Sequence, residues 1–458
     1  MQTNITPREK TTRRQRWAWY SFDIGNSAYA AVVILAIYAA YFKSHVVGGV
    51  EGTRLWGISV GIAMLVVALT SPLLGAIADF SGSKKRFLLA FTVLACVATA
   101  LLYFVQKGDI FIGMLFFILA EIGYRGGQVF YNSLLPEVAE QDEIAKVSGI
   151  GWAIGLLGGI VCLFIVLALV TLNEGVWYVR FSLVITAIYF AIFATPLFLW
   201  LRERAEPETL PPGENYLTVA YDRLKTTIQQ VKHYREFIKF MIAFLIYNDG
   251  ILMAISFAAI FGEVMFGLDQ QQIILFMILI QFTSVIGAYI SGWLAYHTEG
   301  KISLLVFLVL MLAAVIGLFV NQSIPGFYVA GGFAGLALSA VQSTSRAMVG
   351  LLAPEGKSAE FYGFFAVAGR TSSFIGPTIY GLVAAEVALW FAAQGDQASF
   401  LWFEANPLGA PYAEQLGQRV AILSVIAFLV VGLVLLCFVN EKRARFQRQN
   451  HPSRESSS

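Results

Sequence analysis

The chain has 458 residues, of which 58% are hydrophobic and only 13% are charged. Soluble domains are about 45–50% apolar and about 25% charged, so this composition excludes a soluble globular enzyme and a disordered scaffold. Lys and Arg number 31 and Asp and Glu number 29, and this balance gives no charge excess that would favour a nucleic-acid partner. Apolar runs of 20 residues or more, without the alternation of a membrane barrel strand, require membrane-spanning helices.

The pattern predicts twelve membrane-spanning helices and therefore an all-α membrane protein. Eight of them lie in charge-free runs, because the longest run is split into two helices by the turn-forming residues 321–326. The charge-free runs are 55–78, 87–106, 147–173, 181–201, 270–298, 302–345 and 420–440. Four further apolar stretches contain one or two charged residues each, and they are 17–42, 109–135, 237–262 and 361–385.

Lys and Arg in the connecting segments predict the orientation of the chain. With the N-terminus inside, the inside segments hold 24 of these residues and the outside connections hold 5. Basic residues favour the cytoplasmic side of a membrane. Both termini are therefore predicted to be cytoplasmic.

The longest connection divides the predicted helices into two sets of six. Residues 202–235 begin as a charged, Pro-rich linker and continue as an amphipathic helix from Leu217 to Tyr234, which we expect to lie on the cytoplasmic face. The N-terminal six-helix half is then 1–201 and the C-terminal six-helix half is 236–458.

Matching residues recur in the two halves at a nearly constant spacing, which supports duplication of a six-helix unit. The matching pairs are Asp23 with Asp249, Gly75 with Gly292, Pro136 with Pro354, Gly149 with Gly363 and Gly155 with Gly369. Charged and amide residues are concentrated in helices 1, 4, 7 and 10, whereas the interiors of helices 3, 6, 9 and 12 carry none. Helices 1, 4, 7 and 10 are therefore predicted to line a cavity and helices 3, 6, 9 and 12 to face lipid.

A charged turn follows the second predicted helix. It reads Gly75-Ala-Ile-Ala-Asp79-Phe-Ser-Gly82-Ser-Lys84-Lys85-Arg86. This segment resembles the Gly-x-x-x-Asp-x-x-Gly-x-basic-basic signature of the major facilitator superfamily, and the resemblance covers the whole chain. It implies the fold of that superfamily, with a gating motif formed by Gly75, Asp79, Gly82, Lys84 and Lys85.

The chain departs from this signature at three positions. Phe80 and Ser83 stand where basic residues are usual, and Tyr296 stands where the second half would carry an acid. In the superfamily, the acid of the motif holds the second helix to the eleventh when the cytoplasmic side is closed. The resemblance therefore implies a contact between Asp79 and the start of helix 11, near residues 358–361.

Within that superfamily, three segments are similar to the family related to fungal vacuolar amino-acid effluxers. They are Trp17-Ala-Trp-Tyr-Ser-Phe-Asp-Ile-Gly-Asn-Ser-Ala-Tyr29, Tyr247-Asn-Asp-Gly250, and Ser345-Arg346 followed by the Pro354-Glu355-Gly356 turn. The similarity implies transport of an amino acid or a similar small polar solute, with export as the expected direction. The short termini and loops favour a member from a bacterial inner membrane.

Charged residues inside the predicted spans are candidates for transport, since each costs about 2.5–3.5 kcal/mol on insertion scales. Five qualify, namely Asp23, Glu121, Arg125, Asp249 and Arg370. Five amides and one more arginine join them in a candidate set for substrate binding and coupling: Asn26, Gln128, Asn132, Asn248, Gln342 and Arg346. Central arginines and acids together suit a zwitterion, whose carboxylate would bind an arginine and whose ammonium would bind an acid.

Two of these assignments have a clear structural alternative. Glu121 and Arg125 are four residues apart on one helical face, so they either line a cavity or neutralise each other as an ion pair. Arg346 lies near the cytoplasmic end of its helix, so it either faces the site or extends to the membrane interface.

The acids of helices 1 and 7 also allow two interpretations. Asp23 and Asp249 stand beside Gly25 and Gly250, which predicts local unwinding of both helices and exposure of backbone groups to a ligand. Asp249 is the deeper of the two acids and is the predicted proton carrier. The alternative is that each acid is hydrogen-bonded to a partner helix and serves packing alone.

We interpret the chain as a secondary transporter that works by alternating access around a central site. It carries no nucleotide-binding motif, so an ion gradient, most simply of protons, is expected to drive it. The alternatives are a sensor or scaffold that moves nothing and a lipid-modifying enzyme, although all four His lie outside the span interiors. We expect no enzymatic activity, no cofactor and no metal. The expected partners of this monomer of the cell membrane are the lipid bilayer, the solute and the coupling ion.

Overall fold

The fold consists of long helices that are able to cross a membrane. The computed structural model describes residues 12–47, 49–172, 175–204, 207–208, 210, 215–229, 234–268, 270–354, 357–394, 404, 406–407, 409 and 411–442. Within these residues, twelve helices are long and apolar enough to span a bilayer. The predicted all-α membrane fold with twelve spans is confirmed.

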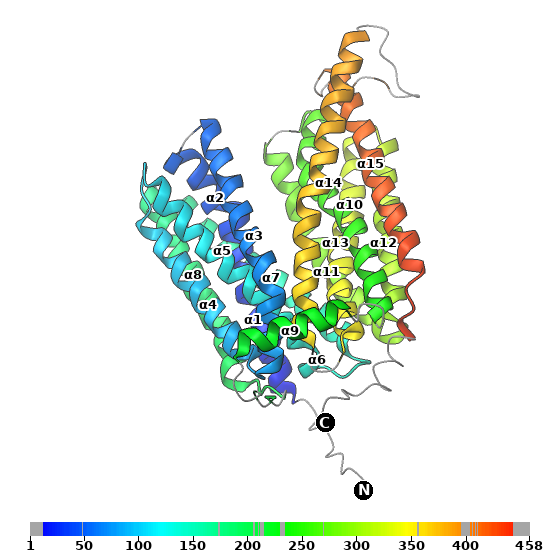
Figure 1. The fold of residues 1–458 in the computed structure, drawn as a ribbon. Coiled ribbons are helices and arrows are strands. Elements are labelled where there is room, and N and C mark those ends of the chain that lie inside the picture. Colours follow the sequence, from blue (N-terminus) through cyan, green and yellow to red (C-terminus); the bar gives the residue numbers. More distant parts are fainter. Residues whose placement is uncertain are drawn as a thin grey trace.

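The spanning helices form two groups that lie side by side (Figure 1). The first group contains α1 (Arg13–Tyr29), α3 (Gly49–Phe80), α4 (Lys84–Leu101), α5 (Ile110–Ser133), α7 (Ile144–Leu172) and α8 (Val176–Trp200). Its short segments are η1 (Ala30–Ala36), α2 (Tyr38–Tyr41), η2 (Phe42–Val47), η3 (Leu102–Phe104) and α6 (Leu135–Val138). The second group contains α10 (Arg235–Phe266), α11 (Gln270–His297), α12 (Gly300–Val320), α13 (Ile324–Leu352), α14 (Ser358–Gln394) and α15 (Tyr412–Cys437).

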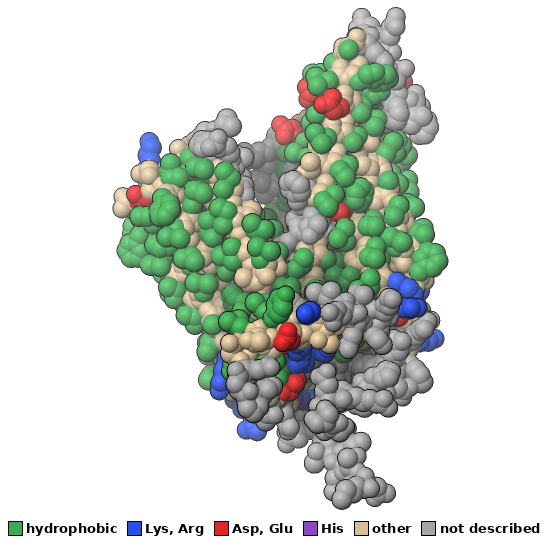
Figure 2. Space-filling model, in the orientation of Figure 1, with side chains coloured by type: hydrophobic (Ala, Val, Ile, Leu, Met, Phe, Trp, Pro, Cys, Tyr) green, Lys and Arg blue, Asp and Glu red, His purple; other side chains and the backbone are tan. Residues whose placement is uncertain are grey.

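The two groups meet at one end of the molecule and separate towards the other (Figure 1). The start of α1, the end of α15 and helix α9 (Tyr216–Gln229) lie at the end where the groups meet. We call this end the terminal face. The space-filling view shows an open gap between the groups on the side away from it (Figure 2).

Glycines let helices of the two groups approach each other near the terminal face. A Cβ atom on Gly75 of α3 would lie 2.5 Å from the carbonyl oxygen of Ala359 in α14. A Cβ atom on Gly149 of α7 would lie 2.7 Å from the Cα of Gly292 in α11. Small residues allow such close contact between membrane helices. We call these two contacts the glycine seam, and they are two copies of one arrangement because Gly75 and Gly292 are matching residues of the halves.

The predicted unwinding beside the two acids is wrong. Helices α1 and α10 remain α-helical through Asp23 and Asp249, so both acids lie within regular helix. The irregular part of the first span lies later, in the π-helical turns Ala30–Ala36.

The glycines beside these acids serve helix packing instead. A Cβ atom on Gly25 would lie 2.7 Å from the Phe190 ring of α8, and one on Gly250 would lie 3.1 Å from Leu429 of α15. A larger residue at either position would push the neighbouring helix away. A glycine within an apolar span is compatible with both unwinding and close packing, and here packing accounts for it.

The outer faces of the helices are apolar. Leu69, Phe111 and Leu172 are 72%, 75% and 82% exposed. Hydrophobic side chains cover the sides of both groups, whereas Lys and Arg gather mainly at the terminal face (Figure 2). This distribution matches a protein whose sides contact lipid, with the terminal face at one membrane surface.

Helix α9 lies across the terminal face and is fastened to α3 (Figure 1). The backbone N–H of Glu208 donates to the Phe80 carbonyl oxygen at 2.9 Å, and the Phe80 and Tyr216 rings are 6.1 Å apart. Arg223 of α9 pairs with Glu208 at 2.8 Å. The amphipathic helix predicted from residue 217 to 234 therefore exists, but α9 ends at Gln229, and residues 230–233 lie outside the described residues.

Candidate functional site: a central cavity and a latch

A central cavity of about 400 Å³ lies between the two groups of helices. The first group lines it with α1, η1, α5 and α7, and the second group with α10, α11, α13 and α14. The polar and aromatic lining residues are Asp23, Asn26, Ser27, Tyr124, Arg125, Gln128, Tyr131, Asn132, Trp152, Phe244, Asn248, Gln281, Gln342, Arg346, Tyr362 and Phe365. Among the described lining residues none belongs to α4, α8, α12 or α15, which agrees with the prediction that helices 3, 6, 9 and 12 face lipid.

An ion pair between the two groups closes the cavity on the side of the terminal face. Arg346 of α13 lies six residues before Leu352, the last residue of that helix, or ~9 Å along its axis. Its Nη1 is 3.4 Å from Oδ2 of Asp23 in α1. Its Nε and Nη2 donate to the hydroxyl and carbonyl oxygens of Ser148 in α7, at 2.9 and 2.7 Å. Arg346 is only 2% exposed, so the alternative that it extends to the membrane interface is wrong.

Three aromatic rings of the first group surround the Arg346 guanidinium. Its Cζ lies 5.1 Å from the ring centre of Trp19, 5.8 Å from that of Tyr131 and 5.0 Å from that of Trp152. Ring faces attract cations, and they hold a planar guanidinium especially well. Sequence reasoning named Arg346 but missed these rings and Ser148 as its partners. For Trp19, the cluster of aromatic residues between Trp17 and Tyr29 was a sequence signal that could have indicated a cation site.

Glu121 and Arg125 form the predicted ion pair, and of the two only Arg125 lines the cavity. The Arg125 Nε donates to Oε1 of Glu121 at 2.6 Å, so the ion pair exists. The Glu121 side chain is 1% exposed, whereas that of Arg125 is 20% exposed and lines the cavity. A guanidinium has five N–H donors. The pair therefore neutralises Glu121 and still presents Arg125 to a ligand.

The five predicted amides all line the cavity. Asn26, Gln128 and Asn132 come from the first group. In the second group, the side-chain amide of Gln342 donates to Oδ1 of Asn248 at 2.9 Å. Gln281 of α11 also lines the cavity and was missed, because it lies in a charge-free run that reads as apolar. No group of three or more His, Cys, Asp and Glu suited to a metal ion occurs in the described part of the chain.

Asp249 lies apart from the cavity lining. It is 1% exposed, and its Oδ1 accepts a hydrogen bond from the Gly376 N–H of α14 at 3.1 Å. Its Oδ2 is buried and has no hydrogen-bond partner among the described residues. The structure does not place Asp249 where it would contact a ligand in the cavity. The side chain of Arg370, another predicted central charge, lies outside the described residues.

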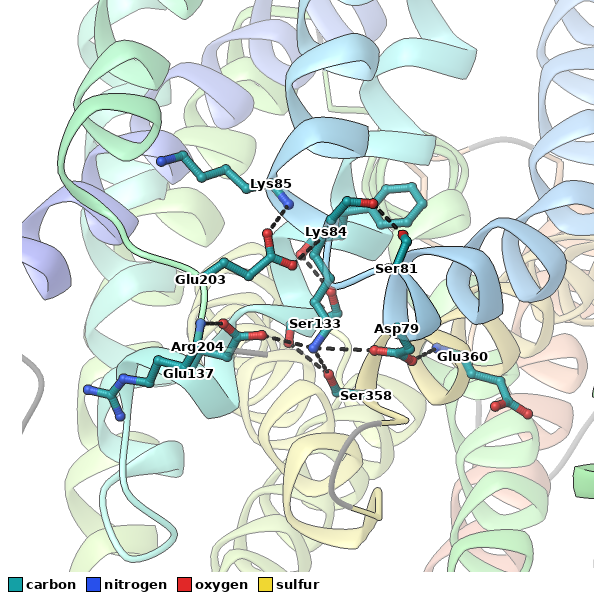
Figure 3. A network of polar contacts seen from close by, with 12 residues as sticks. Asp79, Ser81, Lys84, Lys85, Ser133, Glu137, Glu203, Arg204, Ser358 and Glu360 are labelled. Carbon is teal, nitrogen blue, oxygen red and sulfur yellow. Dashed lines mark hydrogen bonds and ion pairs between the residues drawn. The ribbon is translucent and has the colours of Figure 1, made fainter. Parts of the chain in front are cut away.

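A network of ion pairs within the first group makes hydrogen bonds to the second group at the terminal face (Figure 3). Lys84 Nζ lies 3.2 Å from Asp79 Oδ1 and 2.8 Å from Glu137 Oε1, and it donates to Ser358 Oγ at 2.8 Å. Asp79 Oδ2 accepts the backbone N–H of Glu360 in the first turn of α14, at 2.9 Å. We call these five residues the latch. The contact predicted between Asp79 and the start of helix 11 is present, and the helix dipole there favours a negative charge.

The other two residues of the predicted gating motif act within the first group. Gly82 has a φ of 56° in the turn between α3 and α4, a conformation that favours glycine. Lys85 Nζ donates to the carbonyl oxygen of Leu201 at 2.6 Å. The Glu203 carboxylate accepts the backbone N–H groups of Lys84 at 2.6 Å and Lys85 at 3.2 Å. The end of α8 is thereby bound to the start of α4.

The second group repeats this helix-end arrangement at the start of α12. Glu441 Oε2 accepts the backbone N–H of Lys301 at 2.9 Å, and Lys301 Nζ donates to the Cys437 carbonyl oxygen at 2.7 Å. The second group has no acid at the position equivalent to Asp79. At that position Tyr296 faces Lys146 of the first group, whose Nζ lies 4.4 Å from the ring centre. A cation–π contact between the groups thus stands in the second copy where the first has the hydrogen bond from the Glu360 N–H to Asp79.

Glu203 is expected to make stability depend on pH. Burial, together with the nearby Glu137 charge, raises the pKa of Glu203 from 4.5 to about 7. The folded protein therefore keeps a proton that the unfolded chain loses at lower pH, and the stability contributed by this site falls as pH rises from about 4.5 to about 7.

Glu203→Gln keeps an oxygen acceptor but cannot titrate, so it should flatten the fall in stability between about pH 4.5 and about pH 7. Melting temperatures in detergent from about pH 5 to about pH 8 test this, with Glu140→Gln at an exposed acid as the control; an unchanged slope in Glu203→Gln would contradict it.

Comparison with known proteins places the chain in a family. The model of the family described as "Vacuole effluxer Atg22 like" matches residues 50–387. The chain belongs to this family. The MFS-type transporter YxiO of Bacillus subtilis (strain 168) is 24% identical over 454 residues, covering 96% of this chain and 99% of YxiO. Autophagy-related protein 22 of Yarrowia lipolytica is 24% identical over 291 residues, covering 57% of this chain and 49% of the fungal protein.

Solved structures place this Atg22-like protein in the same fold class. A bacterial homologue of the iron transporter ferroportin, in its outward-facing state, has a TM-score of 0.67 at 12% identity, covering 93% of this chain and 99% of that chain. The human organic anion transporter MFSD10 has a TM-score of 0.67 at 13% identity, covering 94% and 100%. At these identities the likeness shows the fold alone. Together with the family, it confirms the resemblance to the major facilitator superfamily, and the chain is an MFS-type transporter.

Proposed function

We propose that this Atg22-like protein is a secondary active transporter that exports an amino acid or a similar small zwitterion, driven by protons. The family description as vacuole effluxers supports efflux, and the naming of YxiO as an MFS-type transporter supports transport. The cavity lies between the two groups of helices and is closed on the side of the terminal face. This arrangement fits alternating access, in which two halves rock around a central site.

The observation that carries this proposal is Arg125 at the wall of the cavity. Glu121 occupies only its Nε, and the side chain remains 20% exposed. A guanidinium binds a carboxylate through two parallel hydrogen bonds. Asp23 faces the same cavity from α1 and supplies the opposite charge. A zwitterion offers a partner to both charges, whereas an uncharged sugar offers a partner to neither.

The remaining predicted residues have supporting roles in the proposal. The five amides Asn26, Gln128, Asn132, Asn248 and Gln342 are the proposed hydrogen-bond partners of the ligand. Asp23, Glu121 and Asp249 are the candidate proton carriers, and Arg346 and Arg370 complete the proposed set of central charges. The latch at the terminal face is proposed to stabilise the state that is closed there.

Transport by purified protein in proteoliposomes tests this function. Amino acids, peptides, sugars and drugs would be screened, and we expect accumulation of at least one zwitterion under a proton gradient. A hydrogen bond to a charged group contributes about 1.5–3 kcal/mol, so Arg125→Gln should weaken apparent affinity roughly ten- to a hundredfold. Arg125→Lys keeps the positive charge but cannot form the two parallel hydrogen bonds of a guanidinium. Its apparent affinity should lie between those of the wild type and Arg125→Gln. Lys107→Gln, at an exposed lysine, is the control; uptake of sugars alone would overturn the proposal.

We further propose that the protein acts as a monomer in a bacterial inner membrane, with the terminal face in the cytoplasm. The excess of Lys and Arg in the segments that share the side of the termini supports this orientation: it is 23 against 5 once Arg346, which lies in the central site, is left out. The structure then corresponds to an outward-facing state.

Accessibility tags test the proposed orientation. Tags at residue 2, within 205–215 and at the C-terminus should be reached only from the cytoplasm, and a tag near Gln397 only from outside. The reason is the bias in basic residues, which sets the orientation of connected helices. A C-terminus found outside would contradict both the orientation and an even number of spans.

A further inference from the structure

Arg346 belongs to the second group of helices, but the first group builds the site that holds it. Asp23, Ser148 and Trp152 all come from α1 and α7, and all contact the guanidinium. The distance between Arg346 Nη1 and Asp23 Oδ2, 3.4 Å, exceeds the usual 2.7–2.9 Å or so of a charged hydrogen bond. The site is therefore a cation site in the first group, and a side chain of the second group fills it loosely on the Asp23 side.

Beside this pair lies a hydrogen-bond acceptor that has no donor. Asn26 is one helical turn from Asp23, lines the cavity and is 4% exposed. Its Oδ1 is buried and has no partner among the described residues. Buried polar atoms are nearly always hydrogen-bonded, so an unpaired acceptor next to a carboxylate marks a place for a donor from a ligand.

The chemistry of this place suits a primary ammonium group. An ammonium has three donors and no acceptor. Asp23 and Asn26 Oδ1 offer acceptors, and the Trp152 ring offers a face to the positive charge. Gly155 of α7 leaves room there, since a Cβ atom on it would lie 2.9 Å from the Asp23 Cγ.

We propose that the ammonium group of the ligand replaces the Arg346 guanidinium at Asp23, and that this exchange releases the contacts that close the cavity. The inference rests on the proposed function and narrows the ligand to a primary amine that also carries a carboxylate. One buried carboxylate balances one cation, so a second cation in the site would be left without a counter-charge, which is costly. The two cations therefore compete for Asp23.

Release of Arg346 affects the glycine seam directly. Arg346 supplies two hydrogen bonds to Ser148 and the ion pair to Asp23, and all three join the two groups. Ser148 precedes Gly149, which contacts Gly292 in the seam. The freed guanidinium lies ~9 Å along the helix axis from the end of α13, so it reaches water as the seam opens. A ligand without an ammonium group leaves Arg346 in place and the terminal face closed.

The exchange is tested with a single reactive cysteine at the seam. The probe is Ala145→Cys in full-length protein whose Cys96, Cys162 and Cys437 are replaced by serine. Ala145 is 5% exposed, and its carbonyl oxygen lies 3.1 Å from the Cβ position of Gly292. Amino acids are compared with matched 2-hydroxy acids, namely alanine with lactate and phenylalanine with phenyllactate. We expect the amino acids, and not the hydroxy acids, to increase the labelling rate.

Substitutions of Arg346 provide the second measurement. Arg346→Gln removes the competing cation, so labelling should be fast without ligand, and amino-acid affinity should rise about tenfold or more. Arg346→Lys keeps a cation and should keep the dependence on ligand. If Arg346→Gln does not fold, Ser148→Ala serves instead: it removes one partner of the guanidinium and should raise labelling without ligand by a smaller factor.

Several results would overturn the exchange. They are equal labelling with amino acids and hydroxy acids, no response to any amino acid, or an Arg346→Gln protein with wild-type labelling and affinity. Transport assays separate this outcome from failure of the proposed function. If zwitterions are transported but amino acids and hydroxy acids give the same labelling rate, the exchange alone is refuted. Ammonium-dependent labelling without transport of any zwitterion refutes the proposed function and leaves the exchange standing.

Discussion

Replacement of Asp79 by asparagine is expected to open the terminal face and to slow transport, with little change in ligand affinity. Asparagine keeps an oxygen that can accept the Glu360 N–H, but it removes the negative charge that strengthens this hydrogen bond between the two groups. The loss of the charge costs about 1–1.5 kcal/mol as the difference between a charged and an uncharged hydrogen bond, and about 0.3–1 kcal/mol more from the dipole at the start of α14. The population closed at the terminal face should therefore fall roughly ten- to a hundredfold relative to the open one. The cavity lining is untouched, so binding itself should change little.

Labelling of Ala145→Cys and uptake into proteoliposomes measure these two effects of Asp79→Asn. Ser81→Ala is the matched control, because Ser81, in the turn after α3, makes its described side-chain contacts locally, with the Ile77 carbonyl oxygen at 2.7 Å and Ser83 Oγ at 2.5 Å. If labelling and transport both stay at wild-type values, Asp79 does not work as a latch. Glu137, 2.8 Å from Lys84, would then be sufficient to hold that lysine.

Replacement of Asp249 by asparagine is expected to abolish accumulation against a gradient while exchange of ligand across the membrane continues. Asparagine can still accept the Gly376 N–H at the position of Oδ1, so the contact between α10 and α14 is kept. The oxygen that has no partner, Oδ2, can no longer carry a proton. Exchange needs no net movement of protons, and it should therefore survive the substitution.

Asp249→Ala separates coupling from packing. Alanine removes both the proton site and the side-chain acceptor of the Gly376 N–H, and such a hydrogen bond contributes about 0.5–1.5 kcal/mol to stability. If packing is the whole role of Asp249, the asparagine variant should accumulate ligand like the wild type and the alanine variant alone should be impaired. In that case proton coupling must be assigned to Glu121 or to Asp23. Counterflow and gradient-driven uptake, measured on the same proteoliposomes, distinguish these outcomes.

The parts of the molecule that were predictable from the sequence depend on local patterns. Length and apolar character of the runs determine the twelve spans, since a helix needs about 20 such residues to cross a bilayer. The contact between Asp79 and the start of α14 followed from a motif whose position in the chain is specific. Helical spacing likewise placed Glu121 and Arg125 on one face of α5, where they form an ion pair and Arg125 lines the cavity.

The parts that were not predictable depend on how distant helices pack. The sequence predicted that Asp249 lies deeper in the membrane than Asp23, but the direction of its side chain around the helix axis is seen only from the contact with Gly376 of α14. The site of Arg346 joins residues that are about 200 to 320 positions away in the chain, and no local pattern encodes such a meeting. Gly25 and Gly250 read equally well as points of unwinding and as points of close contact, and only the neighbouring Phe190 and Leu429 decide between them.

Helix α9 sets a limit on how far the two halves are able to part at the terminal face. It is held to α3 of the first half, and only residues 230–234 separate its last residue, Gln229, from the first residue of α10 in the second half. A fully extended chain covers at most about 3.3–3.6 Å per residue, so the connection from Gln229 to Arg235 spans at most ~20 Å. While α9 stays docked on α3, the length of this connecting chain limits the separation of the two halves at the terminal face. The limit is the same for every ligand and every driving gradient.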